Sequence, residues 1–260
     1  MRLGLLGTSG AYPIGGDASS GYLVKSGSSS ILIDCGSGVL SNLMRYSNIA
    51  SLQAVFISHM HPDHFIDLIA LNYAVRYGEG SGEMDVYLPK GGRKKFISLL
   101  DVISDGKVVN LSLNLREYVP EKMISLEPFD VLPFEVEHAV PSFGMLISSG
   151  EKNIVYTSDT SPCESLAYWS RKSDLLLSEN TLGGGAPEQN PVTHMSSYDA
   201  GRLAEEAEVS TLVLTHYWPS ADRIACSREA SEYFGGRILQ GVTGKFIDLN
   251  HPESYVTLHS

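Results

Sequence analysis

Short apolar runs in this 260-residue chain repeatedly end in a residue type that can bind a metal ion or a proton. Each run is rich in Leu, Ile or Val and is short enough to form a single strand. The polar residues at or just past the ends of these runs are Asp34, His59, His138, Asp159, Glu179 and His216. Strand ends are where α/β folds place their sites, because a rigid sheet holds the loops that leave it. The pattern therefore predicts an α/β fold with a polar site along a sheet edge.

Apolar periodicity and the Gly, Pro and Ser boundaries predict strands and helices throughout the chain. Strands are expected at 3–7, 21–26, 30–36, 54–58, 85–89, 131–138, 142–148, 153–159, 174–180, 211–216 and 236–249. Helices are expected at 38–47, 64–77, 91–104, 162–171, 197–208 and 222–233. Strands outnumber helices and several form hairpin-like pairs, which indicates two mixed sheets covered by outer helices. No low-complexity linker interrupts the pattern, so residues 1–260 are expected to form a single domain.

The composition limits the partners that the chain is expected to have. Its formal net charge is −11, whereas a domain that follows a nucleic-acid backbone usually presents a basic face. The densest basic cluster, KGGRKK at 90–95, stands alone, so binding of a long nucleic acid is not expected. No apolar run reaches the roughly 18–20 residues of a membrane span, and the N-terminal segment lacks the pattern of a signal peptide. We therefore expect a cytoplasmic protein that does not act at a membrane.

The segment SHMHPDH, which begins at residue 58, brings three histidines and one aspartate together. Alternate residues of an extended loop point the same way, so His59 and His61 could hold one cation. Asp63 and His64 are offset from them and could hold a second. Imidazole nitrogen and carboxylate oxygen bind Zn²⁺ at about 2.0–2.2 Å. Pro62 argues against an ordinary helix here and would stiffen the loop. The alternative is a solvated polar loop, but the spacing favours a metal site.

A metal site in this loop needs further ligands from other parts of the chain. Of the eight histidines, three lie in the loop, and His251 and His259 lie in the C-terminal tail. The remaining three are His138, His194 and His216. His138 and His216 end strong strand patterns, and Asp159 ends the run NIVYTSD. These residues are therefore the candidates for the missing ligands.

This set of residues resembles the five motifs of the metallo-β-lactamase superfamily. The residues that match, in order, are Asp34, the HMHPDH loop, His138, Asp159 and His216. The resemblance spans most of the chain and implies a four-layer αββα sandwich. In that fold two mixed β-sheets are flanked by helices, and the metals lie at one edge. It also implies two divalent metal ions; Zn²⁺ suits the ligands, and Mn²⁺ is an alternative.

The resemblance implies a role for each matching residue. Two sets of three residues would bind the two metals: His59, His61 and His138 for one, and Asp63, His64 and His216 for the other. Asp159 would bridge both ions, and a hydroxide between them would be the nucleophile. Asp34 would support the loop from behind the ligands, unless it only forms a turn before Cys35.

Two further segments resemble the tRNA 3′-processing nucleases, the RNase Z enzymes. They are HAVPSFGMLI, which begins at His138, and THMSSYDAGRLAEEAEVSTLVLTH, which contains His194 and ends at His216. In that group the histidine matching His194 lies near the substrate phosphate, so His194 is expected to be catalytic. Asp63 is also expected to be catalytic. The alternative for His194 is an exposed residue at a helix start. Glu179 is expected behind the ligands, or as a buried polar partner without a part in catalysis.

The spacing between the third and fourth motifs separates the chain from typical RNase Z enzymes. Those enzymes usually carry a long arm that grips tRNA, often in this interval, whereas only 21 positions separate His138 from Asp159. The chain is more similar to compact bacterial proteins of the group that lack the arm, through LGTSGAYP, ASSGYLV, LIDCGSGVLSNL and YTSDT. Some of those proteins are cyclic-nucleotide phosphodiesterases. True β-lactamases, in contrast, tend to have Cys or Ser where this chain has Asp159.

The expected function is hydrolysis of a small anionic phosphodiester, with a 3′,5′-cyclic nucleotide as the best candidate. Two carboxylates, a hydroxide and two divalent ions would give the site a net charge of about +1, which suits such a substrate. The alternatives are an RNA 3′-end endonuclease, a hydrolase of a thioester or lactone, and a metal-dependent sensor without turnover.

Tyr217 and Trp218 could stack on a base, although aromatic residues more often pack in a core. Tyr73, Tyr77 and residues 44–46 offer a face for a homodimer.

Overall fold

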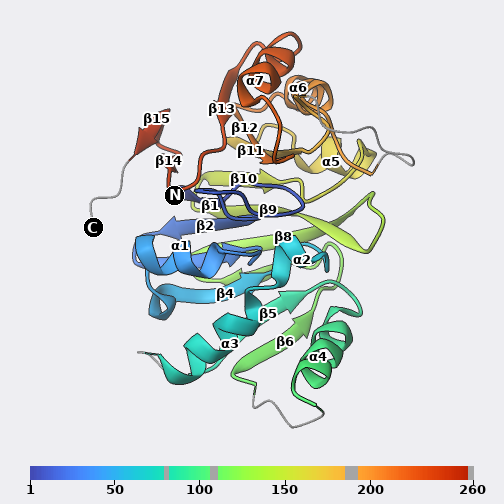
Figure 1. Ribbon diagram of the computed structural model, residues 1–260. Helices are drawn as coiled ribbons and strands as arrows, with labels where there is room; N and C mark the ends of the chain where they lie inside the picture. Colours follow the sequence, from blue (N-terminus) through green and yellow to red (C-terminus); the bar gives the residue numbers. More distant parts are fainter. Residues whose placement is uncertain (79–81, 106–110, 185–192, 257–260) are drawn as a thin grey trace.

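Two β-sheets pack face to face at the centre of the protein, and helices cover their outer faces (Figure 1). The computed structural model describes residues 1–78, 82–105, 111–184 and 193–256. Across the first sheet the strands are β15 (His251–Val256), β14 (Phe246–Asp248), β1 (Arg2–Gly7), β2 (Gly21–Ser26), β3 (Ser29–Ile33), β4 (Leu52–Phe56), β5 (Met84–Leu88) and β6 (Leu113–Glu117). Across the second they are β13 (Arg237–Gln240), β12 (Thr211–Tyr217), β11 (Leu175–Asn180), β10 (Lys152–Tyr156), β9 (Ser142–Ser149), β8 (Phe129–Val136) and β7 (Ile124–Leu126).

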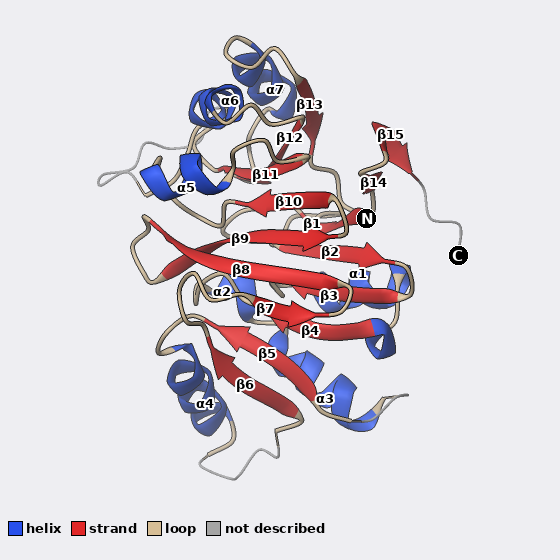
Figure 2. Cartoon of the chain, turned by 180° about the vertical axis from the view of Figure 1, so that it is seen from behind, coloured by secondary structure: helices blue, strands red, loops and turns tan. Residues whose placement is uncertain are grey.

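The helices divide between the two outer faces. Beside the first sheet lie α1 (Val39–Tyr46), α2 (Pro62–Phe65), α3 (Leu68–Tyr77) and α4 (Gly92–Ile103), with a 3₁₀ turn at Ile49–Ser51. Against the second sheet lie α5 (Glu164–Trp169), α6 (Ser197–Glu206) and α7 (Arg223–Ser231). Figure 2, from the opposite side, shows β8 and β9 in front and α1 and α3 behind them. These four layers confirm the predicted αββα sandwich. No helix within the described ranges is long and apolar enough to cross a membrane.

Strands near the centre are apolar on both faces because each face meets a different layer. Leu5 of β1 belongs to the core between the sheets, whereas its neighbour Leu6 packs beneath the helices. In β3, Ile31 and Ile33 face the second sheet and Leu32 faces the helices. Successive side chains of a strand point to opposite faces, so a strand in such a layer must be apolar at nearly every position. This requirement explains the unbroken apolar runs in the sequence.

Parallel pairing brings the carboxyl ends of several strands to one edge of each sheet. β3, β4 and β5 are mutually parallel neighbours in the first sheet, and β10, β11 and β12 are parallel neighbours in the second. Five of the six polar residues that end the apolar runs follow or close these strands, and the sixth, His138, follows β8. The fold therefore gathers them along one edge, between the two sheets.

The structure differs from the sequence-based expectations in a few elements. The helix expected at 64–77 is two helices, because the N–H of Asp67 bonds the carbonyl of Cys35 instead of continuing a helix (3.0 Å). The prediction that Pro62 excludes a helix is wrong. Pro62 is the first residue of α2, a position where its missing N–H costs nothing. Strands β6, β7 and β15 were not predicted; all three are short or polar edge strands with little apolar signal.

Candidate metal centre

The loop after β4 brings together the first group of residues that can bind a metal. His59 Nε2 lies 3.0 Å from His61 Nδ1, and His138 Nε2 lies 3.2 Å from the same His61 atom. His138 follows β8 in the other sheet. Its Nδ1 donates to the carbonyl of Thr193 at 2.9 Å, which turns Nε2 toward the loop. Three imidazoles from the two sheets therefore converge, and Asp159 completes their cluster.

A second group lies beside the first, at the start of α2. Nε2 of His216, near the end of β12, lies 3.1 Å from His64 Nε2 and 3.3 Å from Asp63 Oδ2. Because Pro62 starts α2, Asp63 and His64 occupy its first turn and face the second sheet together. These three residues form a cluster of possible metal ligands separate from that of His59.

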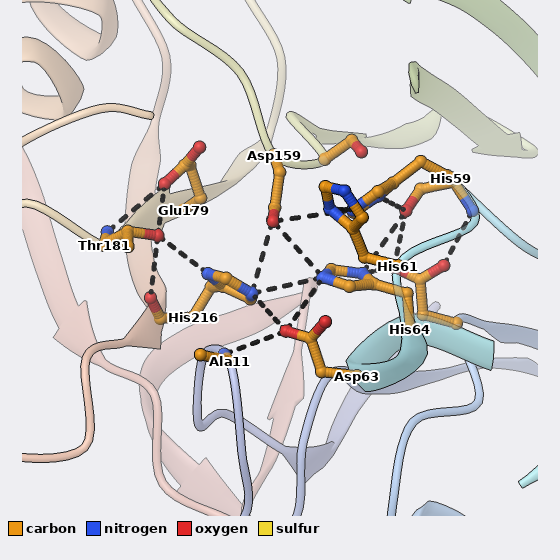
Figure 3. Close-up of polar contacts among 12 residues, drawn as sticks. Ala11, His59, His61, Asp63, His64, Asp159, Glu179, Thr181 and His216 are labelled. Carbon is orange, nitrogen blue, oxygen red and sulfur yellow. Dashed lines mark hydrogen bonds and ion pairs between the residues drawn. The ribbon is translucent and has the colours of Figure 1, made fainter. Parts of the chain in front are cut away.

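Asp159 lies between the two groups, as Figure 3 shows. Its Oδ2 is 3.6 Å from His59 Nε2 and 3.4 Å from His64 Nε2. Its Oδ1 is 3.4 Å from His216 Nε2. One carboxylate thus faces both groups, with a different oxygen toward His216.

The separations within this cluster fit the donor shell of a divalent cation. Donor atoms about 2.0–2.2 Å from one tetrahedral ion lie roughly 3.3–3.6 Å from one another. The contacts of Asp159 with His64 and His216, both 3.4 Å, fall in this range. Among the residues that the structure describes, Asp159 Oδ1 is buried and has no hydrogen-bond partner. A buried carboxylate oxygen without a hydrogen bond is costly unless a cation balances it, so the residues present fit a divalent metal.

Burial leaves three of the histidines uncharged. It lowers the pKa of His59 well below its ordinary value and also lowers the pKa values of His61 and His138. A neutral imidazole offers the lone pair that a metal ion needs. Burial would also lower the pKa of His64, but the Asp159 carboxylate and its acidic neighbours outweigh burial and raise that pKa. The cluster joins neutral donors to anionic groups, which is the composition of a cation site.

Asp34, directly after β3, holds the motif loop from behind. Its carboxylate accepts hydrogen bonds from the N–H and hydroxyl of Ser58 (2.7 and 2.8 Å) and from the hydroxyl of Tyr156 (2.8 Å). It also lies 2.8 Å from Nδ1 of His64, which turns Nε2 of that ring toward the cluster. Asp34 has a φ of 57°, an uncommon conformation for a residue other than glycine, and these contacts hold it there.

Glu179 supports the opposite side of the cluster from the end of β11. Its fully buried carboxylate accepts from the N–H of Thr160 at 2.6 Å and from the hydroxyl of Thr181 at 2.7 Å. The Thr181 oxygen lies 2.8 Å from Nδ1 of His216 and accepts its proton. His194 Nδ1 donates directly to Glu179 at 3.0 Å. One carboxylate therefore orients both His194 and His216.

The same carboxylate changes the charge of His194. Burial lowers the pKa of this imidazole, but the negative charge of Glu179 outweighs burial and raises the pKa to about 9. His194 is thus a proton donor at neutral pH that lies beside a cluster of neutral imidazoles.

The loop between β1 and β2 closes a third side of the cluster. The N–H of Ala11 donates to Asp63 Oδ2 at 2.8 Å. Gly10 lies so close to His216 that a Cβ at this position would be 2.9 Å from its ring. The Gly10 N–H also donates to the carbonyl of Tyr217 at 2.8 Å. The loop is therefore packed tightly against residues of both sheets.

The structure brings together all of the residues that the sequence indicated for this site, and their roles remain predictions. They are Asp34, His59, His61, Asp63, His64, His138, Asp159, Glu179, His194 and His216. Sequence reasoning misses Thr181 and Ala11, which act through a hydroxyl and a backbone N–H and so carry no distinctive signal. Of the two roles considered for Tyr217, stacking on a base or packing in the core, the structure shows packing. Its side chain is fully buried, with the Arg223 guanidinium 4.5 Å from its ring centre.

Comparisons with known proteins agree with this fold. A family model described as the beta-lactamase superfamily domain matches residues 29–217. The chain is 32% identical over 238 residues to the probable metallo-hydrolase YhfI of Bacillus subtilis, covering 92% of this chain and 96% of that protein. The crystal structure of YhfI, a metallo-β-lactamase fold protein, matches with a TM-score of 0.85 at 31% identity, covering 94% of this chain and 97% of that one.

Ribonuclease Z proteins are also similar to this chain. The Ribonuclease Z of Thermoplasma acidophilum is 25% identical over 268 residues, covering 84% of this chain and 87% of that protein. The crystal structure of the short form of human tRNase Z shares the fold, with a TM-score of 0.77 at 24% identity and coverage of 96% and 99%. Together with the His and Asp cluster, these matches define a metal-dependent hydrolase. The chain belongs to the metallo-β-lactamase superfamily.

Proposed function

We propose that this hydrolase cleaves small phosphodiesters, with a 3′,5′-cyclic nucleotide as the best candidate, and that it uses two divalent metal ions. The observation that carries this proposal is the position of Asp159 between the two groups of ligand-type residues, 3.4 Å from both His64 Nε2 and His216 Nε2. A carboxylate shared by two ions is suited to an anionic diester, because paired ions can stabilise both the attacking and the leaving oxygen.

Two sets of residues would hold the ions: His59, His61 and His138 for one, and Asp63, His64 and His216 for the other, with Asp159 shared. Bound there, Zn²⁺ or a similar ion such as Mn²⁺ supplies Lewis-acid polarisation of the phosphate and a water activated at neutral pH. The chain supplies fixed geometry. Asp34 fixes the orientation of the His64 ring, and Thr181 fixes the orientation of the His216 ring. The Ala11 N–H fixes the orientation of the Asp63 carboxylate.

His194 and Asp63 are proposed to take part in the reaction itself. With Nδ1 of His194 held by Glu179, the other ring nitrogen, Nε2, carries the proton that can be given to the leaving oxygen. The side chains of His194 and Asp63 are 13% and 11% exposed, so a substrate can reach them, whereas His59 and His64 are completely buried. Asp63 is proposed to orient the nucleophile through the same carboxylate that binds the metal.

The hairpin after His138 supports a small substrate. Residues 138–159 are all described, and they contain β9 and β10 joined by a short turn, with no inserted arm. The formal net charge of −11 also disfavours a long polyanion. A small diester needs only the metal centre and nearby side chains.

RNA cleavage is the second candidate, and one basic surface favours it. Lys90, Arg93, Lys94 and Lys95 are exposed around the start of α4. This helix start contacts the motif loop, since a Cβ at Gly92 would lie 3.2 Å from the sulfur of Met60. The Ribonuclease Z names of several homologues point to the same substrate class. If RNA is the substrate, Lys94→Glu/Lys95→Glu should reduce its cleavage much more than Arg228→Glu on α7.

A substrate panel tests the proposal. Purified protein with measured metal content is assayed on 3′,5′-cyclic nucleotides, linear dinucleotides, bis(p-nitrophenyl) phosphate, a tRNA precursor, a thioester and a lactone. We expect turnover of cyclic nucleotides and of the aryl diester. Cleavage of the tRNA precursor alone would support the second candidate. Hydrolysis of the thioester or lactone with no phosphodiester turnover would overturn both the small-phosphodiester candidate and the RNA candidate. A metal-loaded protein that is inert to every substrate would support the alternative of a metal-dependent sensor without turnover.

A further inference from the structure

Two aromatic side chains, Tyr12 and Trp218, contact each other, and each belongs to a segment that also contributes to the candidate metal centre. Tyr12 directly follows Ala11, whose N–H bonds Asp63, and Trp218 lies two positions after His216. Their ring centroids are 6.4 Å apart, and the ring planes cross at 81°. The pair therefore joins the two loops that enter the site from opposite sheets.

This pair is accessible, unlike the aromatic residues of the core. Tyr12 is 52% exposed and Trp218 is partly exposed, whereas the adjacent Tyr217 is fully buried. In a perpendicular pair the edge of one ring meets the face of the other, so at least one ring face stays uncovered by its partner. An uncovered aromatic face next to a site proposed to bind a phosphate is suited to a ligand that combines a flat ring with a phosphate.

The loop that carries Tyr12 is held in place before any ligand binds. Asp17, at its far end, pairs with Arg223 of α7 at 2.5 Å and accepts from the N–H of Thr8 at 2.9 Å. Within the loop, the hydroxyl of Ser9 donates to the carbonyl of Tyr12 at 2.8 Å. A loop that is already fixed loses little freedom when a ligand binds to it, so more of the contact energy appears as affinity.

We propose that Tyr12 and Trp218 form a stacking platform for the base of a nucleotide whose phosphate is bound at the metal centre. The inference rests on the proposed phosphodiesterase function and specifies its substrate class as nucleotides rather than alkyl diesters. Stacking accepts any base because every base has a π face. Both purine and pyrimidine nucleotides should therefore bind, and the larger purine ring should bind more tightly.

A binding experiment tests the platform without requiring turnover. The chain has two tryptophans, so Trp169→Phe leaves Trp218 as the only one. The metal-loaded variant is titrated with AMP and with ribose 5-phosphate, which has the phosphate and sugar but no base. We expect AMP to quench the Trp218 fluorescence in a saturable way and ribose 5-phosphate to leave it unchanged. Quenching of equal size by both ligands, or AMP competing with substrate but causing no quenching, would overturn the platform.

A kinetic experiment tests both residues on the substrate. Tyr12→Ala and Trp218→Ala should each lower kcat/KM for a 3′,5′-cyclic nucleotide by about tenfold, the usual effect of losing one stacked ring. Trp218→Phe keeps a ring face and should recover most of that loss. Tyr77→Ala, which removes a tyrosine that is 73% exposed on α3, is the matched control and should change nothing. A cyclic alkyl phosphate without a base should be hydrolysed equally by all variants.

The two experiments separate the platform from the proposed function. Turnover of cyclic nucleotides with no quenching and no effect of Tyr12→Ala would overturn the platform and leave the phosphodiesterase standing. AMP quenching in a protein that does not hydrolyse cyclic nucleotides would support the platform and overturn the proposal that cyclic nucleotides are the substrate.

Discussion

Nδ1 of His194 lies 3.0 and 3.1 Å from the two oxygens of the buried Glu179 carboxylate. This forked contact fixes the plane of the imidazole and leaves only Nε2 to meet a substrate. The same carboxylate reaches His216 through the hydroxyl of Thr181. Glu179 thus connects the proposed proton donor to a proposed metal ligand.

Replacement of His194 should slow the chemical step. His194→Ala is expected to lower kcat by about 10²- to 10⁴-fold, the usual contribution of a positioned proton donor, with KM changed much less. Glu179→Gln, which keeps the shape but removes the charge, should also lower kcat. Steady-state kinetics on the best substrate of the panel measures both effects. Metal content should stay normal in His194→Ala; a loss of metal there would assign the residue to the ligand set instead.

Asp159 is expected to be indispensable. Asp159→Ala removes the carboxylate that faces both groups, so turnover should be abolished while the fold remains largely intact. Metal analysis, circular dichroism and activity should be measured on the same preparation. Near-normal hydrolysis by a variant that still holds its metals would refute the shared-ligand assignment.

Removal of metal should remove activity and lower stability together. Chelation is expected to abolish turnover, and addition of Zn²⁺ or Mn²⁺ should restore it. An ion present at about 100 times its Kd stabilises the folded state by about 2.7 kcal/mol, so the thermal midpoint should fall by several degrees on chelation. Differential scanning calorimetry with and without chelator provides this measurement. Unchanged activity after verified metal loss would exclude a metal-dependent reaction.

The close approach of Gly10 to His216 gives a test with a control in the same loop. Gly10→Ala would place a Cβ 2.9 Å from the His216 ring, so the ring or the loop must shift. A displacement of this kind is expected to lower activity by about 10²-fold. Gly15→Ala, whose Cβ would have no neighbour within 4 Å, should have nearly normal activity. Equal activities in the two variants would show that this loop does not position His216.

The ion pair between Arg223 and Asp17 should contribute to stability. The two side chains are 24% and 9% exposed, and Arg223→Met would leave the Asp17 carboxylate without its charged partner. We expect the free energy of unfolding to fall by about 3 kcal/mol, as for other mostly buried pairs. Chemical denaturation measures this loss. Arg202→Met, which removes an exposed i,i+4 pair with Glu206, is the control and should have little effect.

The central strands and the ligand-type residues could be predicted from the sequence because their signals are strong and local. Strands such as β3 must be apolar at nearly every position, which produces a clear apolar run in the sequence. Histidines repeated at the ends of such runs indicate a functional site. The edge strands β6, β7 and β15 have no such requirement, since one side of each is open to solvent. The break between α2 and α3 depends on a contact of Asp67 with Cys35, which lies 32 positions away, and no local pattern reports it.

The orientation of the site could not be predicted for a related reason. Thr181 holds His216 with a hydroxyl, and Ala11 holds Asp63 with a backbone N–H. Every chain contains many such groups, and only the tertiary structure selects the ones that matter. The paired aromatic residues Tyr12 and Trp218 are likewise 206 positions apart in the sequence, so nothing short of the folded chain connects them.

The candidate metal-binding residues are divided between the two sheets, so local opening of the protein should depend on metal. The motif loop belongs to the first sheet, whereas His138, Asp159 and His216 belong to the second. Metal bound between these residues would connect the two sheets along this edge. When metal is scarce, this edge should open locally before either sheet unfolds. Amide hydrogens of 58–64 and 159–161 would then exchange faster than those of the central strands, which would make this edge a sensor of metal supply within an otherwise stable fold.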